Sequence, residues 1–245
     1  MNNKVVVYTV ITGGYDKINP VLNNEDNLNV DFVIVSDESM VVPDGWELKL
    51  IPREPGQSNI EYNRKLKIKP TTIFQKYKIH IYLDSNIQVI KNISKLINDF
   101  VVNEHQIALY EHPVRSNVYD EAEEIKRIGY DYYFKIDRQM NRYRSVGFDG
   151  KGLYEANIIL RRNNAAVGNV MDTWWNEFNI GIKRDQLSLT YSCFINNMEI
   201  FCLGRHDGRF VHDFFCYENH LRKNASRNLL ARATNIVAKK IGLSS

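Results

Sequence analysis

Short apolar runs alternate along the chain with helix-length amphipathic or polar stretches. Apolar runs bounded by polar turn residues are typical of buried strands, and their alternation with helices is typical of an α/β fold. Strands are predicted at residues 4–11, 31–36, 46–51, 79–83, 106–110, 153–161 and 199–203. Helices are predicted at residues 59–69, 94–101, 117–128, 165–179 and 184–195, with one more near the C-terminus. Residues 131–152 show no clear period, so we expect a long loop or lid there.

One buried run ends abruptly on oxygen-bearing side chains. Residues 79–83 are followed by Asp84, Ser85 and Asn86. In open α/β sheets, ligands bind beyond the carboxyl ends of the strands. A hard divalent cation prefers oxygen ligands, which Asp84 and Asn86 can supply from one short segment.

Other polar residues support more than one interpretation. Gly13 and Gly14 follow the first strand and let backbone approach a ligand, although a glycine pair is also an ordinary turn. Arg64 and Lys67 precede Pro70 on a predicted helix and indicate either a diphosphate site or a solvated basic face.

Three polar residues in the second half of the chain are further candidates. Asp185 opens a predicted helix and is a candidate base, a stabiliser of positive charge, or an N-cap. Glu155 and Asn157 are two apart on a predicted strand, which places both side chains on one face.

The composition is that of a soluble globular protein with one main domain. The 245 residues are 44% hydrophobic and 25% charged, and a net charge of +3 is too small to indicate nucleic-acid binding. Three cysteines without metal-ligand spacing argue for a reducing compartment, and no apolar run reaches the length of a membrane span or an export signal. We therefore expect a cytoplasmic protein.

Charge is concentrated at the C-terminus. Residues 219–245 contain six Lys or Arg residues and no Asp or Glu, so we divide the chain into a domain at 1–218 and a basic helical tail at 219–245. One side of the predicted helix carries Leu229, Ala233, Ile236, Val237 and Ile241, and Arg227, Arg232, Lys239 and Lys240 are basic, a pattern typical of a helix at a membrane surface. Packing against its own domain or against a partner gives a similar pattern.

An ordered set of short motifs resembles a known family. The motifs are Tyr8-Thr9 with Gly14-Tyr15-Asp16, Ser36-Asp37-Glu38, Trp46, Asn63-Arg64 with Lys67 and Pro70, Tyr82-Leu83-Asp84-Ser85-Asn86, His112-Pro113-Val114-Arg115, Val118-Tyr119-Asp120-Glu121-Ala122, Gly152-Leu153-Tyr154-Glu155-Ala156-Asn157, and Arg184-Asp185-Gln186-Leu187-Ser188. The chain from Tyr8 to about His220 resembles the glycosyltransferase-like domain of plant pectin and mucilage enzymes and bacterial polysaccharide-locus proteins, long catalogued as a domain of unknown function.

The resemblance implies a GT-A fold, a Rossmann-like α/β sandwich with a mixed central sheet that binds a nucleotide-sugar. It implies donor or nucleotide contacts for Tyr8, Thr9, Gly14, Tyr15, Asp37, Arg64, Lys67, Asp84 and Ser85. It implies sugar or acceptor contacts for His112, Arg115, Asn157, Arg184 and Gln186. Asp185 and Glu155 are the catalytic candidates, and Asp84, Asn86 and His220 are the candidate ligands for Mn²⁺ or Mg²⁺, with His206 and His212 as alternatives to His220.

The expected function is a glycosyltransferase that moves a hexose from a UDP-sugar to a bacterial surface glycan such as lipopolysaccharide or capsule. Retention of configuration is implied, with Asp185 supporting an oxocarbenium-like centre; if the enzyme inverts, Asp185 or Glu155 is the general base. Partners would be the nucleotide-sugar, a glycan or lipid-linked glycan acceptor and a membrane surface, but no nucleic acid. Asn86, where a second acid is usual, leaves two alternatives: reduced metal dependence, or a silent nucleotide- or carbohydrate-binding subunit of another transferase.

Overall fold

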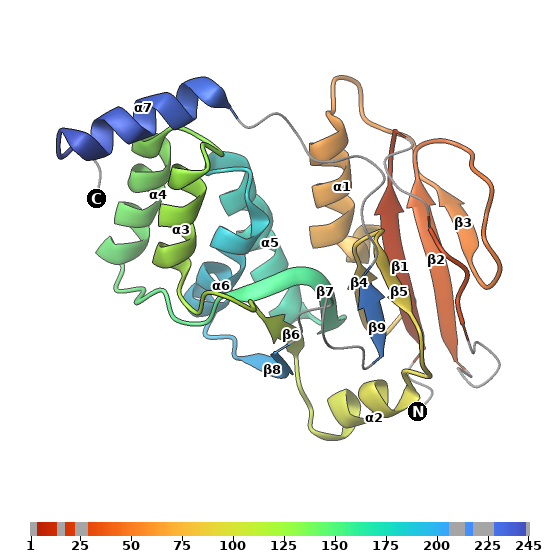
Figure 1. Cartoon of the computed structure of the whole chain (residues 1–245). Coiled ribbons are helices and arrows are strands. Elements are labelled where there is room, and N and C mark those ends of the chain that lie inside the picture. Colours follow the sequence, from red (N-terminus) through yellow and green to blue (C-terminus); the bar gives the residue numbers. More distant parts are fainter. Residues whose placement is uncertain (1–3, 14–17, 23–28, 206–213, 218–227, 244–245) are drawn as a thin grey trace.

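A seven-stranded mixed sheet forms the centre of the molecule in a computed structural model that describes residues 4–13, 18–22, 29–205, 214–217 and 228–243 (Figure 1). The strand order is β3-β2-β1-β4-β7-β6-β8. The strands are β1 (Val5–Ile11), β2 (Val30–Ser36), β3 (Glu47–Leu50), β4 (Ile79–Leu83), β6 (Ile107–Glu111), β7 (Tyr154–Arg162) and β8 (Ile200–Arg205), while β5 (Ile87–Val89) pairs with β9 (Phe215–Tyr217) in a small second sheet.

Helices pack around this sheet and extend to one side of it (Figure 1). They are α1 (Asn59–Ile68), α2 (Ser94–Val102), α3 (Val118–Arg127), α4 (Tyr133–Ser145), α5 (Ala165–Ile180), α6 (Asp185–Ile195) and α7 (Leu229–Lys240), with a 3-10 turn, η2, at Pro70–Thr72. Figure 1 shows α7 crossing one end of the neighbouring helices α3 and α4. Within the described residues, no helix combines the length and the apolar character needed to cross a bilayer.

The strand directions bring distant polar residues to one edge of the sheet. Strands β3, β2, β1 and β4 are parallel, whereas β7 is antiparallel to both of its neighbours, β4 and β6. The carboxyl end of β4 therefore lies beside the beginning of β7, with Leu83 opposite Ile158. As a result Asp84 meets the segment that carries Glu155 and Asn157.

The core lies on both faces of the sheet. One buried cluster contains Tyr8, Tyr82 and Trp174 beneath α1, α5 and α6, and the opposite cluster contains Ile81 and Phe100 beneath α2. All seven residues of β1 are buried, as expected for a parallel strand that is covered on both faces. This burial fixes the positions of the strand ends that carry polar side chains.

The predicted strands and helices are confirmed to within a few residues, but the predicted long loop at 131–152 is wrong. Most of that segment is α4, whose buried residues Ile136, Gln139, Met140 and Tyr143 recur at helical spacing. The pattern is hard to recognise because a glutamine and a tyrosine occupy buried positions. Strands β5 and β9, three residues each, were not predicted.

Candidate functional site

Helix α1 holds a lysine inside the protein. Ser58 and Glu61 form a capping box at its start, and Pro70 follows its end. Tyr8 donates a hydrogen bond to the Lys67 carbonyl oxygen over 2.9 Å, and the Arg161 guanidinium donates to the same carbonyl. Lys67 is therefore fixed at the last turn of α1 and is 1% exposed.

Lys67 forms an ion pair with Asp185. The Lys67 Nζ atom lies 2.6 Å from Oδ2 of Asp185, and Arg64 Nε lies 3.2 Å from the same oxygen. Asp185 is the first residue of α6 and is 5% exposed, and Trp174 donates to its carbonyl oxygen over 3.0 Å. Burial alone would raise the pKa of Asp185, but Arg64 and Lys67 outweigh it and hold that pKa well below its usual value. The carboxylate therefore remains ionised at neutral pH.

Asp84 lies on the other side of Lys67. Its Oδ1 atom is 3.7 Å from Lys67 Nζ and accepts a hydrogen bond from the Tyr82 hydroxyl over 2.8 Å. Its backbone N–H donates to the Asn157 carbonyl over 2.8 Å, which ties the end of β4 to β7. The buried Lys67 thus lies between two acids that the sequence predicts for the site, Asp84 and Asp185. The Asp84 side chain is 32% exposed.

Glu155 has a different environment. Its Oε2 accepts from Gln186 Nε2 over 3.0 Å, while Oε1 is 3.6 Å from His112 Nε2. Burial raises the pKa of Glu155 to about 7, since Arg184 lowers it only partly and Asp84 and Glu121 raise it further. Glu155 can therefore gain or lose a proton near neutral pH.

His112 is oriented by backbone. Its Nδ1 atom accepts from the N–H groups of Val114 and Arg115, over 3.2 and 3.0 Å, so in the neutral ring the proton is on Nε2, which faces Glu155. Burial lowers the pKa of His112, assisted by the charge of Arg115, which favours this neutral form.

Arg115 and Arg184 are held together by an acid that the sequence analysis did not select. Glu121 is 1% exposed, and its two oxygens accept from Arg115 Nε over 2.7 Å and from Arg184 Nη2 over 2.9 Å. A carboxylate between two guanidinium groups fixes the distance between them. The available signal was its place on the buried face of α3, beside Val118 and Ala122.

A second polar group lies at the ends of β1 and β2. Arg53 donates through Nε to Asp37 Oδ2 over 2.9 Å and through its other nitrogens to Thr12 and Asn59. Hydrogen bonds from Thr12 and Arg53 outweigh burial and lower the pKa of Asp37. Arg53 was not predicted, because nothing in its local pattern marks it. Gly13 has φ +64°, and a Cβ there would come 2.8 Å from the Asn59 amide.

Several predicted residues are placed differently or not described. Tyr8 and Thr9 are buried in β1, where Tyr8 supports Lys67 and the Thr9 hydroxyl has no hydrogen-bond partner within the described residues. Ser85 and Asn86 form the turn between β4 and β5. Asn157 donates to the Tyr217 hydroxyl over 2.6 Å. The predicted residues outside the described part of the chain are Gly14, Tyr15, His206, His212 and His220.

No complete metal site is formed by the described residues. Across residues 4–13, 18–22, 29–205, 214–217 and 228–243, no group of three or more His, Cys, Asp or Glu side chains is placed to hold a metal ion. Asp84 offers carboxylate oxygens, and Oδ1 of Asn157 is buried without a hydrogen-bond partner in this part of the chain. Such oxygens suit Mn²⁺ or Mg²⁺ chemically, but a complete site needs ligands from elsewhere, such as a diphosphate.

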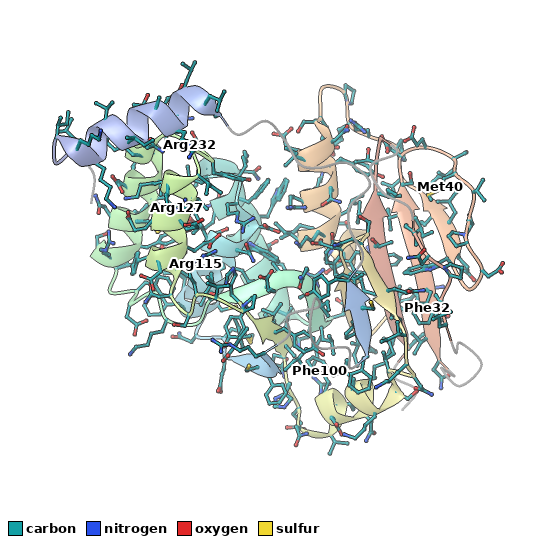
Figure 2. The ribbon with its side chains drawn as sticks, in the orientation of Figure 1. Phe32, Met40, Phe100, Arg115, Arg127 and Arg232 are labelled. Carbon is teal, nitrogen blue, oxygen red and sulfur yellow. The ribbon has the colours of Figure 1, made fainter. Side chains whose placement is uncertain are left out.

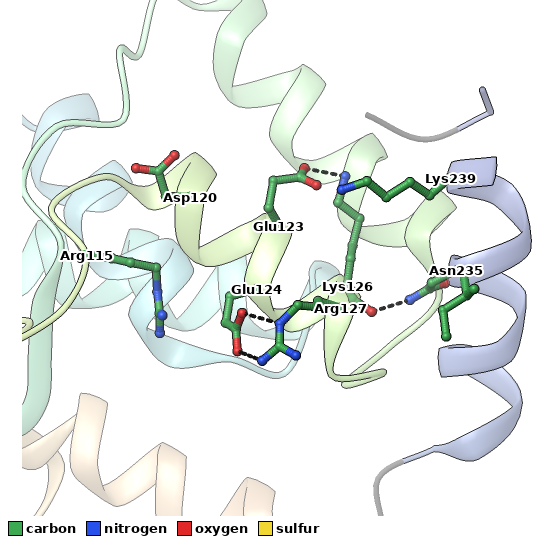
Figure 3. Close-up of a pocket in the computed structure, with 9 residues that line it drawn as sticks. Arg115, Asp120, Glu123, Glu124, Lys126, Arg127, Asn235 and Lys239 are labelled. Carbon is green, nitrogen blue, oxygen red and sulfur yellow. Dashed lines mark hydrogen bonds and ion pairs between the residues drawn. The ribbon is translucent and has the colours of Figure 1, made fainter. Parts of the chain in front are cut away.

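Two cavities are lined by described residues. One of about 260 Å³ lies between α3 and α7, with Arg115, Lys126 and Asn235 in its lining (Figure 3). Another of about 390 Å³ lies between the turn at 54–57, α1 and α5, next to Trp175. Neither is lined by Asp84, Glu155 or Asp185, so the site is defined by its buried charges rather than by these cavities.

Comparison with known proteins identifies the domain. A sequence model of the TOD1/MUCI70 family, a glycosyltransferase-like domain, matches residues 46–202, well over half of the chain. No match is found among curated proteins.

Two solved structures are similar in fold. The WbbM bifunctional glycosyltransferase in its apo form has a TM-score of 0.52 at 12% identity, over 83% of this chain and 39% of that one. Mouse xyloside xylosyltransferase 1 in its apo form aligns over 83% of this chain and 85% of that one, with 9% identity and a TM-score of 0.45. The first similarity concerns the fold alone, and the predicted glycosyltransferase α/β fold is confirmed.

Proposed function

Because the chain belongs to the TOD1/MUCI70 family of glycosyltransferase-like domains, we propose that it transfers a hexose from a nucleotide-sugar to a glycan. The expected donor is a UDP-sugar, and the expected product is a bacterial surface glycan such as lipopolysaccharide or capsule. The observation that carries the proposal is the chain of charges Asp84, Lys67, Asp185 and Arg64 at the edge of the sheet where α/β folds bind ligands.

The donor diphosphate would lie near Asp84, Arg64 and Lys67. A diphosphate concentrates negative charge, which the two cations of α1 offset. Asp84 would hold Mn²⁺ or Mg²⁺ together with diphosphate oxygens, and the metal would neutralise the diphosphate as it leaves. The nucleoside would lie toward Asp37 and Thr12, where the Asp37 Oδ1 atom is buried and has no hydrogen-bond partner in the described part of the chain.

The sugar would lie toward Glu155, Asn157 and Gln186. Asn157 Oδ1 and Gln186 Oε1 are buried acceptors without hydrogen-bond partners among the described residues. Buried acceptors normally have a donor, and sugar hydroxyl groups would supply one. His112 Nε2 and the guanidinium groups of Arg115 and Arg184 add donors beside them.

We favour a retaining reaction with distinct roles for the two acids. The bond from the anomeric carbon to the phosphate oxygen breaks, and its electron pair leaves with the phosphate. The acceptor hydroxyl oxygen forms the new bond, and its proton passes to that phosphate. Asp185, kept ionised by Arg64 and Lys67, would stabilise positive charge at the anomeric carbon. In an inverting reaction Glu155, with a pKa of about 7, would suit the base better than Asp185.

We place the protein at the cytoplasmic face of a membrane, where lipid-linked glycan acceptors are presented. The basic residues of segment 219–245 support this location, since each Lys or Arg near an anionic surface adds about 1 kcal/mol of attraction.

Nucleotide binding tests the proposal. Titration calorimetry with UDP, with and without Mn²⁺, should detect binding to the wild type. With Mn²⁺, Asp84→Asn should weaken that binding by roughly tenfold or more, because a neutral amide is a poorer metal ligand than a carboxylate. Asp44→Asn, the same change at an exposed acid, is the matched control and should bind as the wild type does.

Two outcomes would contradict the proposal. Absence of binding for every nucleoside diphosphate, with and without metal, would exclude nucleotide-sugar chemistry. Equal binding by Asp84→Asn and Asp44→Asn would remove Asp84 from the diphosphate site. If UDP binds as expected, a screen of nucleotide-sugars for hydrolysis would identify the donor.

A further inference from the structure

Helix α7 is held on the protein by its small residues. The buried residues of α7 are Ala231, Asn235 and Ala238. Asn235 accepts from the Tyr133 N–H over 2.8 Å and donates to the carbonyl oxygens of Lys126 and Asp131, over 3.0 and 2.9 Å. These bonds connect α7 to the end of α3 and the beginning of α4, so its orientation is fixed.

Gly129 allows α7 to lie close to the segment that follows α3. Gly129, just beyond α3, has φ +72°, and a Cβ there would lie 2.9 Å from backbone atoms of Arg232. Real Cβ atoms do not come this close, so the contact depends on the glycine. Figure 2 labels Arg232 on α7 and Arg127 on α3, on the same side of the molecule.

The large apolar residues of α7 face away from the protein. Leu229 is 72% exposed, Leu230 73%, Val237 56% and Ile241 63%. At 3.6 residues per turn these residues, with Ile236, span an arc of about 140° opposite the buried residues. On a helix that buries alanine and asparagine, an exposed face of leucine, valine and isoleucine is typical of an interaction surface.

Charge identifies that partner. Lys240 lies within the apolar arc, Arg232 and Lys239 lie about 40° and about 60° beyond its edge at Ile236, and residues 219–245 contain no acidic residue. A second copy packed through the same face would bring cations against cations. An anionic lipid surface satisfies both features, because the apolar side chains enter the acyl boundary while Lys and Arg contact headgroups.

A cavity connects α7 with Arg115 of the candidate site. The cavity of about 260 Å³ beneath α7 is lined by both Lys239 of α7 and Arg115 (Figure 3). Arg115 is also ion-paired with Glu121 in the polar cluster. The cavity therefore extends from the protein-facing side of α7 to Arg115, which precedes α3.

We infer that the exposed face of α7 binds an anionic lipid surface and holds the enzyme there. This inference specifies the membrane contact of the proposed function. Lipid binding needs no donor, acceptor or metal, so a failure here is distinguishable from a failure of the proposed activity.

Vesicle co-sedimentation of the full chain tests the inference. The wild type should sediment with vesicles of equal parts phosphatidylglycerol and phosphatidylcholine, less at high salt, and not with pure phosphatidylcholine. Val237→Asp should reduce binding by roughly tenfold, through lost apolar burial and added repulsion. Val41→Asp makes the same change at a valine that is 91% exposed outside α7, and it should bind as the wild type does.

The double variant Lys239→Gln and Lys240→Gln should also weaken vesicle binding. UDP binding should be unchanged in all these variants. Equal vesicle binding by Val237→Asp and Val41→Asp would overturn the inference, as would absence of binding to anionic vesicles by the wild type. A concentration-dependent dimer that Val237→Asp abolishes, without vesicle binding, would overturn it in favour of a second copy. Binding to an acidic protein surface without vesicle binding would overturn it in the same way.

Discussion

Asp185, which is buried, and Glu155, which is partly buried, are two acids of the candidate site with opposite properties. Asp185 lies 2.6 Å from Lys67 Nζ and 3.2 Å from Arg64 Nε, and its pKa is held well below the usual value. Glu155 contacts a neutral amide and a neutral imidazole, and burial raises its pKa to about 7. Burial acts in the same direction on both acids, so the difference comes from the cations of α1.

The two sides of the candidate site differ in how their charges are held. On the α1–α6 side, charges are paired and fixed, as electrostatic stabilisation requires. On the β6–β7 side, the Glu155 carboxyl group can exchange a proton near neutral pH, and the nearby amide oxygens of Asn157 and Gln186 have no hydrogen-bond partner among the described residues. This difference supports different roles for the two acids, and substitutions of each acid can test it.

The largest expected effect is that of Asp185→Asn. The change leaves Lys67, which is 1% exposed, without its closest counter-charge. Breaking a buried ion pair in this way costs about 3–5 kcal/mol. Urea unfolding should show this loss in free energy of unfolding, and donor hydrolysis should fall sharply in the folded variant.

A paired variant separates charge from packing. Lys67→Met combined with Asp185→Leu removes both charges and should be more stable than Asp185→Asn, because no isolated charge stays buried. A loss below about 1 kcal/mol in Asp185→Asn, the range of an exposed pair, would contradict the fixed ion pair.

The second-largest expected effect is a pH dependence of the free energy of unfolding, caused by Glu155. Its folded pKa of about 7 exceeds the ordinary value of 4.5, so its stabilising contribution is complete below pH 4.5 and is lost as the pH rises to about 7. Glu155→Gln should therefore be more stable than the wild type above pH 7, by about 3 kcal/mol, and nearly equal to it below pH 4.5.

The difference between wild type and Glu155→Gln isolates this group, because other titrating residues such as His80 are common to both proteins. Unfolding by urea at several pH values measures it. A difference that does not change between pH 4.5 and 7 would contradict the raised pKa and, with it, the proton-exchanging role.

The local sequence pattern singled out individual residues of the candidate site but not the contacts between them. Asp84 and Asp185 were recognisable as the residues at a strand end and at a helix start, because the spacing of apolar residues and the polar turn residues mark these positions. The N-cap alternative for Asp185 is wrong, since Arg184 is the cap residue and Asp185 is the first helical residue. The counter-charge of Asp185, Lys67, is 118 residues away in the chain.

Other contacts could not be predicted, because they depend on tertiary packing. Glu121 resembled an ordinary helix-start acid, yet it lies between two arginines from other segments. Arg53 lies in an irregular segment, and only the fold brings it to Asp37. The pKa of Glu155 depends on desolvation, which no spacing of residues in the sequence reports.

The smallest expected effect concerns Gln186→Met. Gln186 donates to Glu155 over 3.0 Å, which favours the ionised carboxylate. A hydrogen bond of this kind contributes about 1 kcal/mol, so its loss should raise the pKa of Glu155 by somewhat less than about one unit. Gln75→Met, at an exposed glutamine, is the matched control and should leave that pKa unchanged. A lowered or unchanged value in Gln186→Met would contradict the contact.

Carbon-13 NMR titration of the side-chain carboxyl groups tests the central claim most directly, with signals assigned through Asp185→Asn and Glu155→Gln. The account predicts that Asp185 stays ionised well below the ordinary aspartate pKa, whereas Glu155 titrates at about 7 in the same sample. Titration of both groups near pH 4 would contradict the division of this site into a fixed anion and a proton-exchanging acid.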